Sequence, residues 1–265
     1  MSEVSGPPVQ EPAPDAGSSA AAGQGAQAAA RPISPDAATA WAVLVFVVAQ
    51  AIGAAVILIW YSARAATDSS SMYYDGTLVA LVTLVTNPVL VGLFWGVVRY
   101  HGQDAREFLG LTGFTLWNFL IGVLAIAVLA ATLYFVASLA KLDLVPRFQT
   151  DTFTSARRDG WLVPLFLAVV VVGPIGEEIM FRGFLYRGWV RPGFVVTPIL
   201  LLTLLWSAMH LQYDWFGLTQ VFLTGLVLAW LRWRSGSTAL TVLLHMLVNL
   251  EATIETVLKV GWVTA

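Results

Sequence analysis

The chain has 265 residues, of which 58% are hydrophobic and 11% are charged, and its mean hydropathy is +0.76. Soluble domains contain about 45–50% apolar residues, so this composition excludes an ordinary water-soluble protein and indicates an integral membrane protein. The net charge of −2 gives no basis for nucleic-acid binding, and the lack of cysteine excludes disulfides and thiolate chemistry.

In chain order, residues 1–36 come first and are rich in Pro, Ala, Gly and Ser, which predicts a disordered tail. Apolar runs follow whose lengths suit membrane-spanning helices rather than the short alternating strands of a barrel. They lie at about 38–62, 76–100, 116–140, 161–186, 198–213, 215–233 and 238–260. We therefore expect an all-α, polytopic transmembrane bundle of seven spans, with eight as the alternative. Residues 37–160 would supply about three N-terminal spans, and residues 161–265 the helical core that carries the chemistry.

The distribution of basic residues predicts the orientation. With seven spans, the side that holds the N-terminus collects Arg31, Arg99, Arg106, Arg182, Arg187, Arg191, Arg232 and Arg234. The opposite side collects Arg64, Lys141, Arg147, Arg157, Arg158 and Lys259. Cytoplasmic loops carry an excess of Lys and Arg, so we expect the N-terminus in the cytoplasm.

The segment AVVVVGPIGEEIMFRGFLY, residues 168–186, places ionisable groups at the end of an apolar run. An ionisable group at membrane depth costs at least about 2.5–3.5 kcal/mol and normally faces the interior of the bundle. Glu178 and Arg182 are four residues apart and can pair on one helix face. Glu177 lies about 100° further round an α-helix, so it is predicted to remain available for chemistry.

Two histidines also fall inside apolar runs, His210 four residues after Trp206 and His245 four residues before Asn249. Counted at 1.5 Å per residue, Glu177, His210 and His245 lie about 14, 18 and 10 Å from the same membrane face. We therefore expect these three side chains to converge.

Other polar residues receive structural interpretations. Glu251 and Glu255 share one face of the last span and are interpreted as interfacial, and His101 is interpreted as a loop residue.

Taken together, three motifs on separate helices resemble the CPBP (Abi) family of intramembrane proteases. This family includes CAAX prenyl proteases, bacteriocin-processing enzymes and the Ras-converting endopeptidase. The motifs are EEIMFR at 177–182, WSAMH at 206–210 and HMLVN at 245–249, and the resemblance covers about 161–250. The family has phenylalanine where this chain has Trp206, a departure that we expect to affect only packing.

The resemblance implies a peptidase mechanism. Glu177, helped by His210, would activate a water molecule, while His245 and Asn249 would stabilise the tetrahedral intermediate. The supporting residues would be Glu178, Arg182 and Trp206. The expected substrate is a peptide or protein at the lipid bilayer, and we expect the protein in the inner (cell) membrane of a bacterium.

Several alternatives remain open. Glu177, His210 and His245 also match the ligand set of a catalytic zinc site, although we favour a mechanism without a metal. The zincin motif His-Glu-x-x-His and the serine elbow Gly-x-Ser-x-Gly are absent from the sequence. An inactive CPBP-fold scaffold, a membrane-protein partner or a proton-coupled transporter would also bury such groups.

Overall fold

The computed structural model describes residues 31–64 and 74–261. The predicted disordered tail therefore lies outside the described residues up to position 30. Its predicted end at residue 36 falls within the first helix, α1 (Pro35–Arg64), which begins two residues earlier than the expected domain boundary.

Within the described ranges every regular element is a helix, which confirms the all-α class. The long helices after α1 are α2 (Gly76–Tyr100), α4 (Leu116–Ala140), α10 (Trp215–Ser235) and α11 (Thr238–Val260). A further continuous helical stretch consists of α6 (Leu162–Phe166), η2 (Leu167–Val172), α7 (Gly173–Glu178), η3 (Ile179–Leu185) and α8 (Tyr186–Trp189), with π-helical geometry in η2 and η3. The shorter helices are α3 (Ala105–Phe108), α5 (Arg147–Arg158) and α9 (Val196–Ala208).

Six of the described helices are long and apolar enough to cross a membrane, so the predicted count of seven or eight spans is not confirmed. The difference lies in α9, which has 13 residues and is about 20 Å long, compared with a hydrocarbon core of about 30 Å. The expected helix at 198–213 ends at Ala208, and the chain turns before Asp214 accepts a hydrogen bond from Gly217 N at the start of α10. His210 consequently lies in a turn and not inside a helix.

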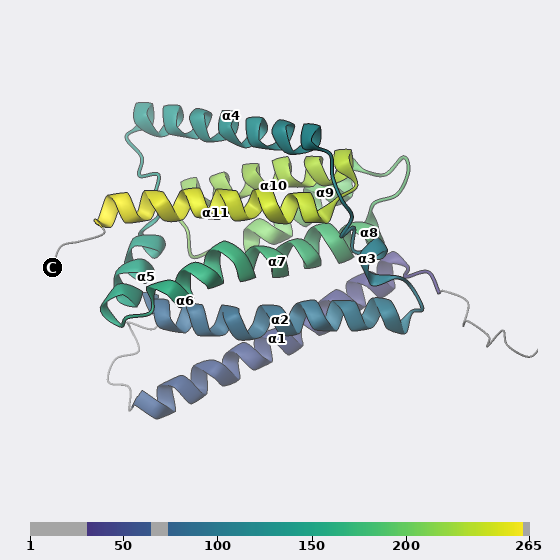
Figure 1. Ribbon diagram of the computed structural model, residues 1–265, viewed down its shortest axis with the longest axis horizontal. Coiled ribbons are helices and arrows are strands. Elements are labelled where there is room, and N and C mark those ends of the chain that lie inside the picture. Colours follow the sequence, from purple (N-terminus) through teal and green to yellow (C-terminus); the bar gives the residue numbers. More distant parts are fainter. Residues whose placement is uncertain (1–30, 65–73, 262–265) are drawn as a thin grey trace, which may run out of the picture.

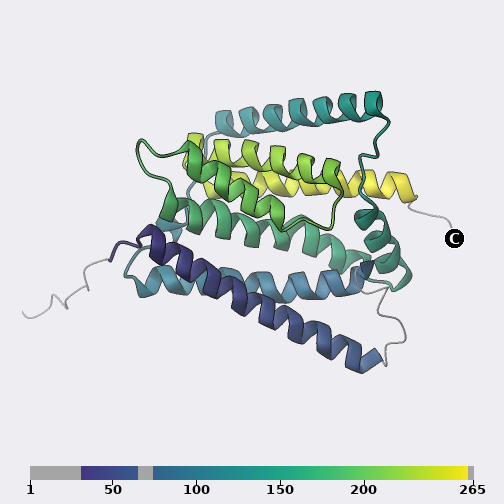
Figure 2. The ribbon, with the colours of Figure 1, turned by 180° about the vertical axis from the view of Figure 1, so that it is seen from behind.

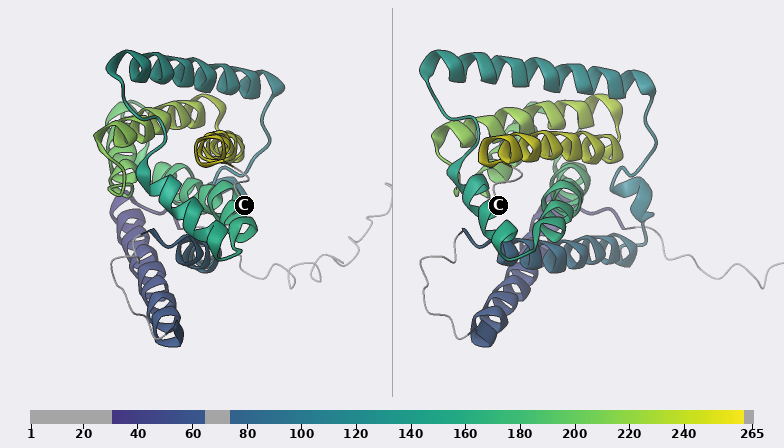
Figure 3. Two further views of the ribbon diagram at one scale, coloured as in Figure 1. Left: turned by 90° about the vertical axis from the view of Figure 1, so that its left-hand side faces the viewer. Right: turned by 60° about the vertical axis from the view of Figure 1, so that its left-hand side comes forward.

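The long helices run side by side in layers, as Figures 1 and 2 show. Helix α4 lies on one outer side, followed by α10 with α11, then by the stretch containing α7, and finally by α2 with α1. Figure 3 shows α4 crossing above the other helices. Few α4 residues are buried, and one of them, Gly122, faces Leu244 of α11.

The main packing cluster joins η3 to α2 and α1. The rings of Phe94 and Phe184 lie 4.6 Å apart, and Ala38 packs where a side chain on Gly188 would collide. Small residues allow helices to approach closely in membranes. His101 belongs to the same end of the bundle: it caps α2, and its Nε2 accepts a hydrogen bond from Trp41 Nε1 at 3.2 Å. It therefore has a packing role beyond that of a simple loop residue.

Candidate active site

Glu177 and Glu178 end α7, between the two π-helical segments. A π-helix bonds each N–H to the carbonyl five residues earlier, and such segments are frequent at functional sites. In η2, Gly173 N bonds to Ala168 O in this way. The next donor would be Pro174, which has no N–H, so Val169 O lacks that bond. Asn249 Nδ2 donates to Val169 O at 2.7 Å instead, which ties α11 to the helix that carries the two acids.

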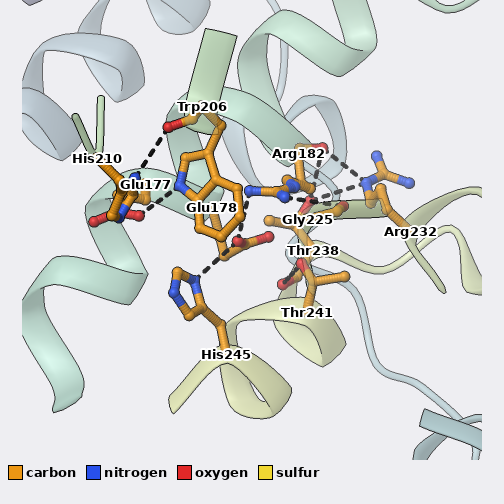
Figure 4. A network of polar contacts seen from close by, with 10 residues as sticks. All are labelled: Glu177, Glu178, Arg182, Trp206, His210, Gly225, Arg232, Thr238, Thr241 and His245. Atoms are coloured by element: carbon orange, nitrogen blue, oxygen red, sulfur yellow. Dashed lines mark hydrogen bonds and ion pairs between the residues drawn. The ribbon is translucent and has the colours of Figure 1, made fainter. Parts of the chain in front are cut away.

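Behind the site, Glu178 forms a buried ionic network. Arg182 Nη1 donates to Glu178 Oε1 at 2.9 Å, and His245 Nδ1 lies 3.0 Å from the same oxygen. Arg182 Nη2 also donates to Gly225 O at 3.2 Å, as Figure 4 shows. The predicted Glu178–Arg182 pair is confirmed, and its side chains are 0% and 4% exposed.

The main-chain carbonyl of Arg182 is held as well. Arg232 Nε donates to Arg182 O at 2.9 Å, and Thr238 Oγ1 donates to the same oxygen at 3.2 Å. A return from π-helical to α-helical bonding leaves one carbonyl without a backbone donor, and these side chains provide bonds at the end of η3. In the sequence, Arg232 is counted only among the basic residues that predict orientation. Its bond to Arg182 joins two different helices, and such a contact produces no regular spacing in the sequence.

Trp206 contacts four other members of the site, Glu177, Arg182, His210 and His245. Its Nε1 donates to Glu177 Oε2 at 2.6 Å, and the Arg182 guanidinium carbon lies 4.5 Å from its ring centroid. The His210 and His245 rings meet it edge-on, with centroids at 5.2 and 5.4 Å. The expectation that tryptophan here changes only packing is wrong, because phenylalanine has no N–H with which to hold Glu177.

Gly225 makes room for this arrangement. A Cβ atom at this position would lie 2.7 Å from Trp206 Cε3, and the Gly225 carbonyl is the one that Arg182 contacts. Gly225 therefore permits α10 to approach Trp206 closely.

His210 lies in the turn after α9, and its Nδ1 is 3.1 Å from Trp206 O. A carbonyl oxygen can only accept, so Nδ1 carries the proton in this contact. In the neutral ring, Nε2 is then left as an acceptor. This tautomer suits a group that assists in removing a proton from water.

A cavity of about 460 Å³ brings the predicted catalytic residues together. Glu177, His210, His245 and Asn249 all line it, with Trp206 between them. Much of the remaining wall is apolar and comes from α4, α5, α10 and α11. Glu178 and Arg182 lie behind this wall, which fits the supporting role predicted for them.

Tyr213 is a cavity residue that sequence reasoning missed. It follows His210 in the turn, its ring lies 5.8 Å from the His210 ring, and Gln149 Nε2 donates to its hydroxyl at 3.4 Å. Burial raises the pKa of the Tyr213 phenol above its usual value; the hydrogen bond from Gln149 opposes this rise, and the charge of Glu177 adds to it. The phenol is therefore a hydrogen-bond donor at neutral pH.

The candidate zinc ligands Glu177, His210 and His245 are not arranged as a metal site. Among residues 31–64 and 74–261, no group of three or more His, Cys, Asp or Glu side chains is arranged to hold a metal ion. His245 directs Nδ1 to Glu178, and Glu177 is bonded to Trp206. The set Glu177, His210 and His245 is therefore not assembled as a coordination site.

Comparison with known proteins finds matches over part of the chain. Residues 159–250 match the family model described as Type II CAAX prenyl endopeptidase Rce1-like, close to the predicted limits of 161–250. An uncharacterized 24.3 kDa protein of Escherichia coli is 32% identical over 126 residues, which are 46% of this chain. The match covers 57% of the length of that relative. No solved structure matches the chain.

Proposed function

We propose that the chain is an intramembrane endopeptidase of the CPBP family, a proposal supported by the match of residues 159–250 to the Rce1-like family model. Its substrate would be a membrane-associated or lipidated peptide or protein. The observation that carries the proposal is one cavity lined by Glu177, His210, His245 and Asn249, beside helices that are long and apolar enough to cross a membrane. A peptidase requires a base for water and donors for the oxyanion, and these residue types supply both.

Glu177 is the proposed general base. Trp206 holds Oε2, so the carboxylate has a fixed orientation, and Oε1 has no hydrogen bond to another described residue. A water molecule bound at Oε1, with His210 Nε2 as a second acceptor, would lose its proton to Glu177 as its oxygen attacks the scissile carbonyl carbon. Glu177 then passes this proton to the departing amine, which balances the hydrolysis.

His245 and Asn249 are the proposed oxyanion donors. His245 Nδ1–H is directed to Glu178, so Nε2 donates to the oxyanion only when the ring is an imidazolium. Glu178 Oε1 contacts both Arg182 and His245, so one carboxylate faces both cations when the ring is protonated. Asn249 uses one amide proton for Val169 O and retains a second for the substrate.

The proposed location is the inner membrane of a bacterium, with the N-terminus in the cytoplasm. The long helices support membrane insertion. The orientation rests on the arginine count for seven spans; with the six described spans, seven basic residues fall on each side. The reaction as proposed involves no nucleic acid and uses no metal.

Substrate trapping tests the proposal. We expect Glu177→Ala and His210→Ala to abolish proteolysis in membranes while leaving expression intact, with exposed Glu107→Ala as a matched control. General-base catalysis contributes about 10²–10⁴-fold, so a loss below about tenfold in both variants would refute the assignment. Mass spectrometry of proteins retained by Glu177→Ala would identify the substrate. A scaffold would retain partners without any cleavage, and a transporter would lose flux instead.

A further inference from the structure

The active-site cavity continues beyond the catalytic residues along α11, where Glu251 and Glu255 line it. These acids are four residues apart and occupy neighbouring positions on one helix face. At 1.5 Å per residue they lie about 9 and 15 Å beyond His245. The proposed mechanism uses neither of them.

Neither acid has a cationic partner. Within the described part of the chain, no salt bridge involves Glu251 or Glu255, and Glu255 Oε1 is buried without a hydrogen bond. Lys259 is placed to pair with Glu255 four residues earlier. Its Nζ contacts Asp143 Oδ1 at 3.0 Å and Val145 O at 3.3 Å instead.

Thr152 of α5 is a second polar residue of this cavity with an oxygen that is unpaired within the described ranges. The residue lines the same cavity and is 4% exposed, yet its hydroxyl has no hydrogen-bond partner among the described residues. A buried polar group without a partner costs about 1–3 kcal/mol. N–H donors of a ligand would suit a hydroxyl oxygen and a carboxylate alike.

The charge of the cavity selects the ligand. Of the described residues, those lining it include three carboxylates, Glu177, Glu251 and Glu255, and no lysine, arginine or aspartate. Such a site, with mainly apolar walls, attracts a cation and disfavours an anion. The apolar walls also suit the methylene stem of a long basic side chain.

We propose that Glu251 and Glu255 form a specificity subsite for a lysine or arginine side chain of the substrate. This inference rests on the proposed protease function. An extended peptide advances about 3.3 Å per residue, so the distances along α11 place the basic residue about three to five positions from the cleaved bond.

A peptide library tests the subsite. The full-length wild-type protein, in a detergent without charged or amine groups, is incubated with randomised synthetic peptides, and mass spectrometry identifies the products. We expect Lys and Arg to be enriched three to five positions from the cleaved bond on one side. For a matched pair of peptides, replacing that Lys by Gln should lower kcat/KM about two- to fivefold, as for an ion pair that is partly exposed to solvent.

Variants of the acids connect the preference to the subsite. Glu251→Gln, Glu255→Gln and the double variant should cleave the Gln peptide as wild type does, but lose the preference for Lys. Glu255→Lys should favour a peptide with Glu at that position. Glu107→Gln, an exposed acid on α3, should leave the preference unchanged.

The outcomes separate this inference from the function on which it rests. Glu177-dependent cleavage with no charge preference, or a preference that survives the double variant, would overturn the subsite and leave the protease function standing. Absence of all Glu177-dependent cleavage, in cells and in the library, would remove the function itself.

Discussion

Variants of the buried pair Glu178–Arg182 test whether Glu178 has a structural role while Glu177 has the catalytic one. Its side chains are 0% and 4% exposed, and Glu178 Oε1 also faces His245. Removing one partner of a buried pair leaves the other charge uncompensated, at about 3–5 kcal/mol. At roughly 2–4 °C per kcal/mol, Arg182→Ala should lower Tm by about 6–20 °C. Glu178→Gln keeps the shape but loses the charge, and its Tm should also fall.

The double variant measures the coupling. Glu178→Gln combined with Arg182→Ala should be more stable than the sum of the single losses predicts, because neither charge remains alone. Contacting residues typically show coupling of about 0.5–3 kcal/mol. Glu177 has no ionic partner among residues 31–64 and 74–261, so Glu177→Gln should remove activity with little change in Tm.

Thermal unfolding in detergent, followed by the fluorescence of the tryptophans, and cleavage of a trapped substrate provide the two readouts. The reasoning fails if the Tm losses of Glu178→Gln and Arg182→Ala simply add. It also fails if Glu177→Gln destabilises the protein more than Glu178→Gln does, since the roles of the two acids would then be reversed.

Three further predictions follow from the contacts around the site. Trp206→Phe removes the N–H donated to Glu177, a bond to a charged group of about 1.5–3 kcal/mol, so kcat/KM should fall about 10–150-fold; unchanged kinetics would show that the indole does not orient the base. Thr238→Val removes one bond to the Arg182 carbonyl and should lower Tm, whereas Thr238→Ser should not, and equal effects would contradict the role of the hydroxyl. Dialysis against a strong chelator should leave activity unchanged, and restoration of lost activity by stoichiometric zinc would reverse the metal-free assignment.

The sequence alone predicted that the two acids belong to the site and that a helix carries them, because both predictions depend on hydropathy and spacing within short segments. The cost of ionisable groups in lipid identified Glu177, Glu178 and the two motif histidines, and spacing of four residues predicted the bond to Arg182, which the structure confirms. The spacing of Glu178 and Arg182 is a local property of a helix, and it persists in the folded chain.

Contacts between helices could not be predicted in this way. The hydrogen bond from Trp206 to Glu177 joins residues 29 positions apart, and the bond from Arg232 to Arg182 O joins residues 50 apart. The end of α9 was misplaced because Met209 and Leu211 continue the apolar run after Ala208, so hydropathy gives no sign of the turn. Tyr213 was missed for the same reason, since its position in the cavity depends on that turn.

Because of the two π-helical segments, the geometry of this site depends on the number of residues in the helical stretch as well as on their types. Each α-helical residue advances the side-chain direction by about 100°, so the spacing between η2 and η3 sets the direction in which Glu177 and Glu178 point. Removing a single residue from either segment would rotate the part of the helix before the deletion relative to the part after it. An acid would then be separated from its partner even if all motif residues were retained. Helix α4 buries few residues, and its length does not determine the direction of Glu177 or Glu178. Homologous chains would therefore be expected to differ freely in length around α4 and to keep the residue count from Leu167 to Leu185 unchanged.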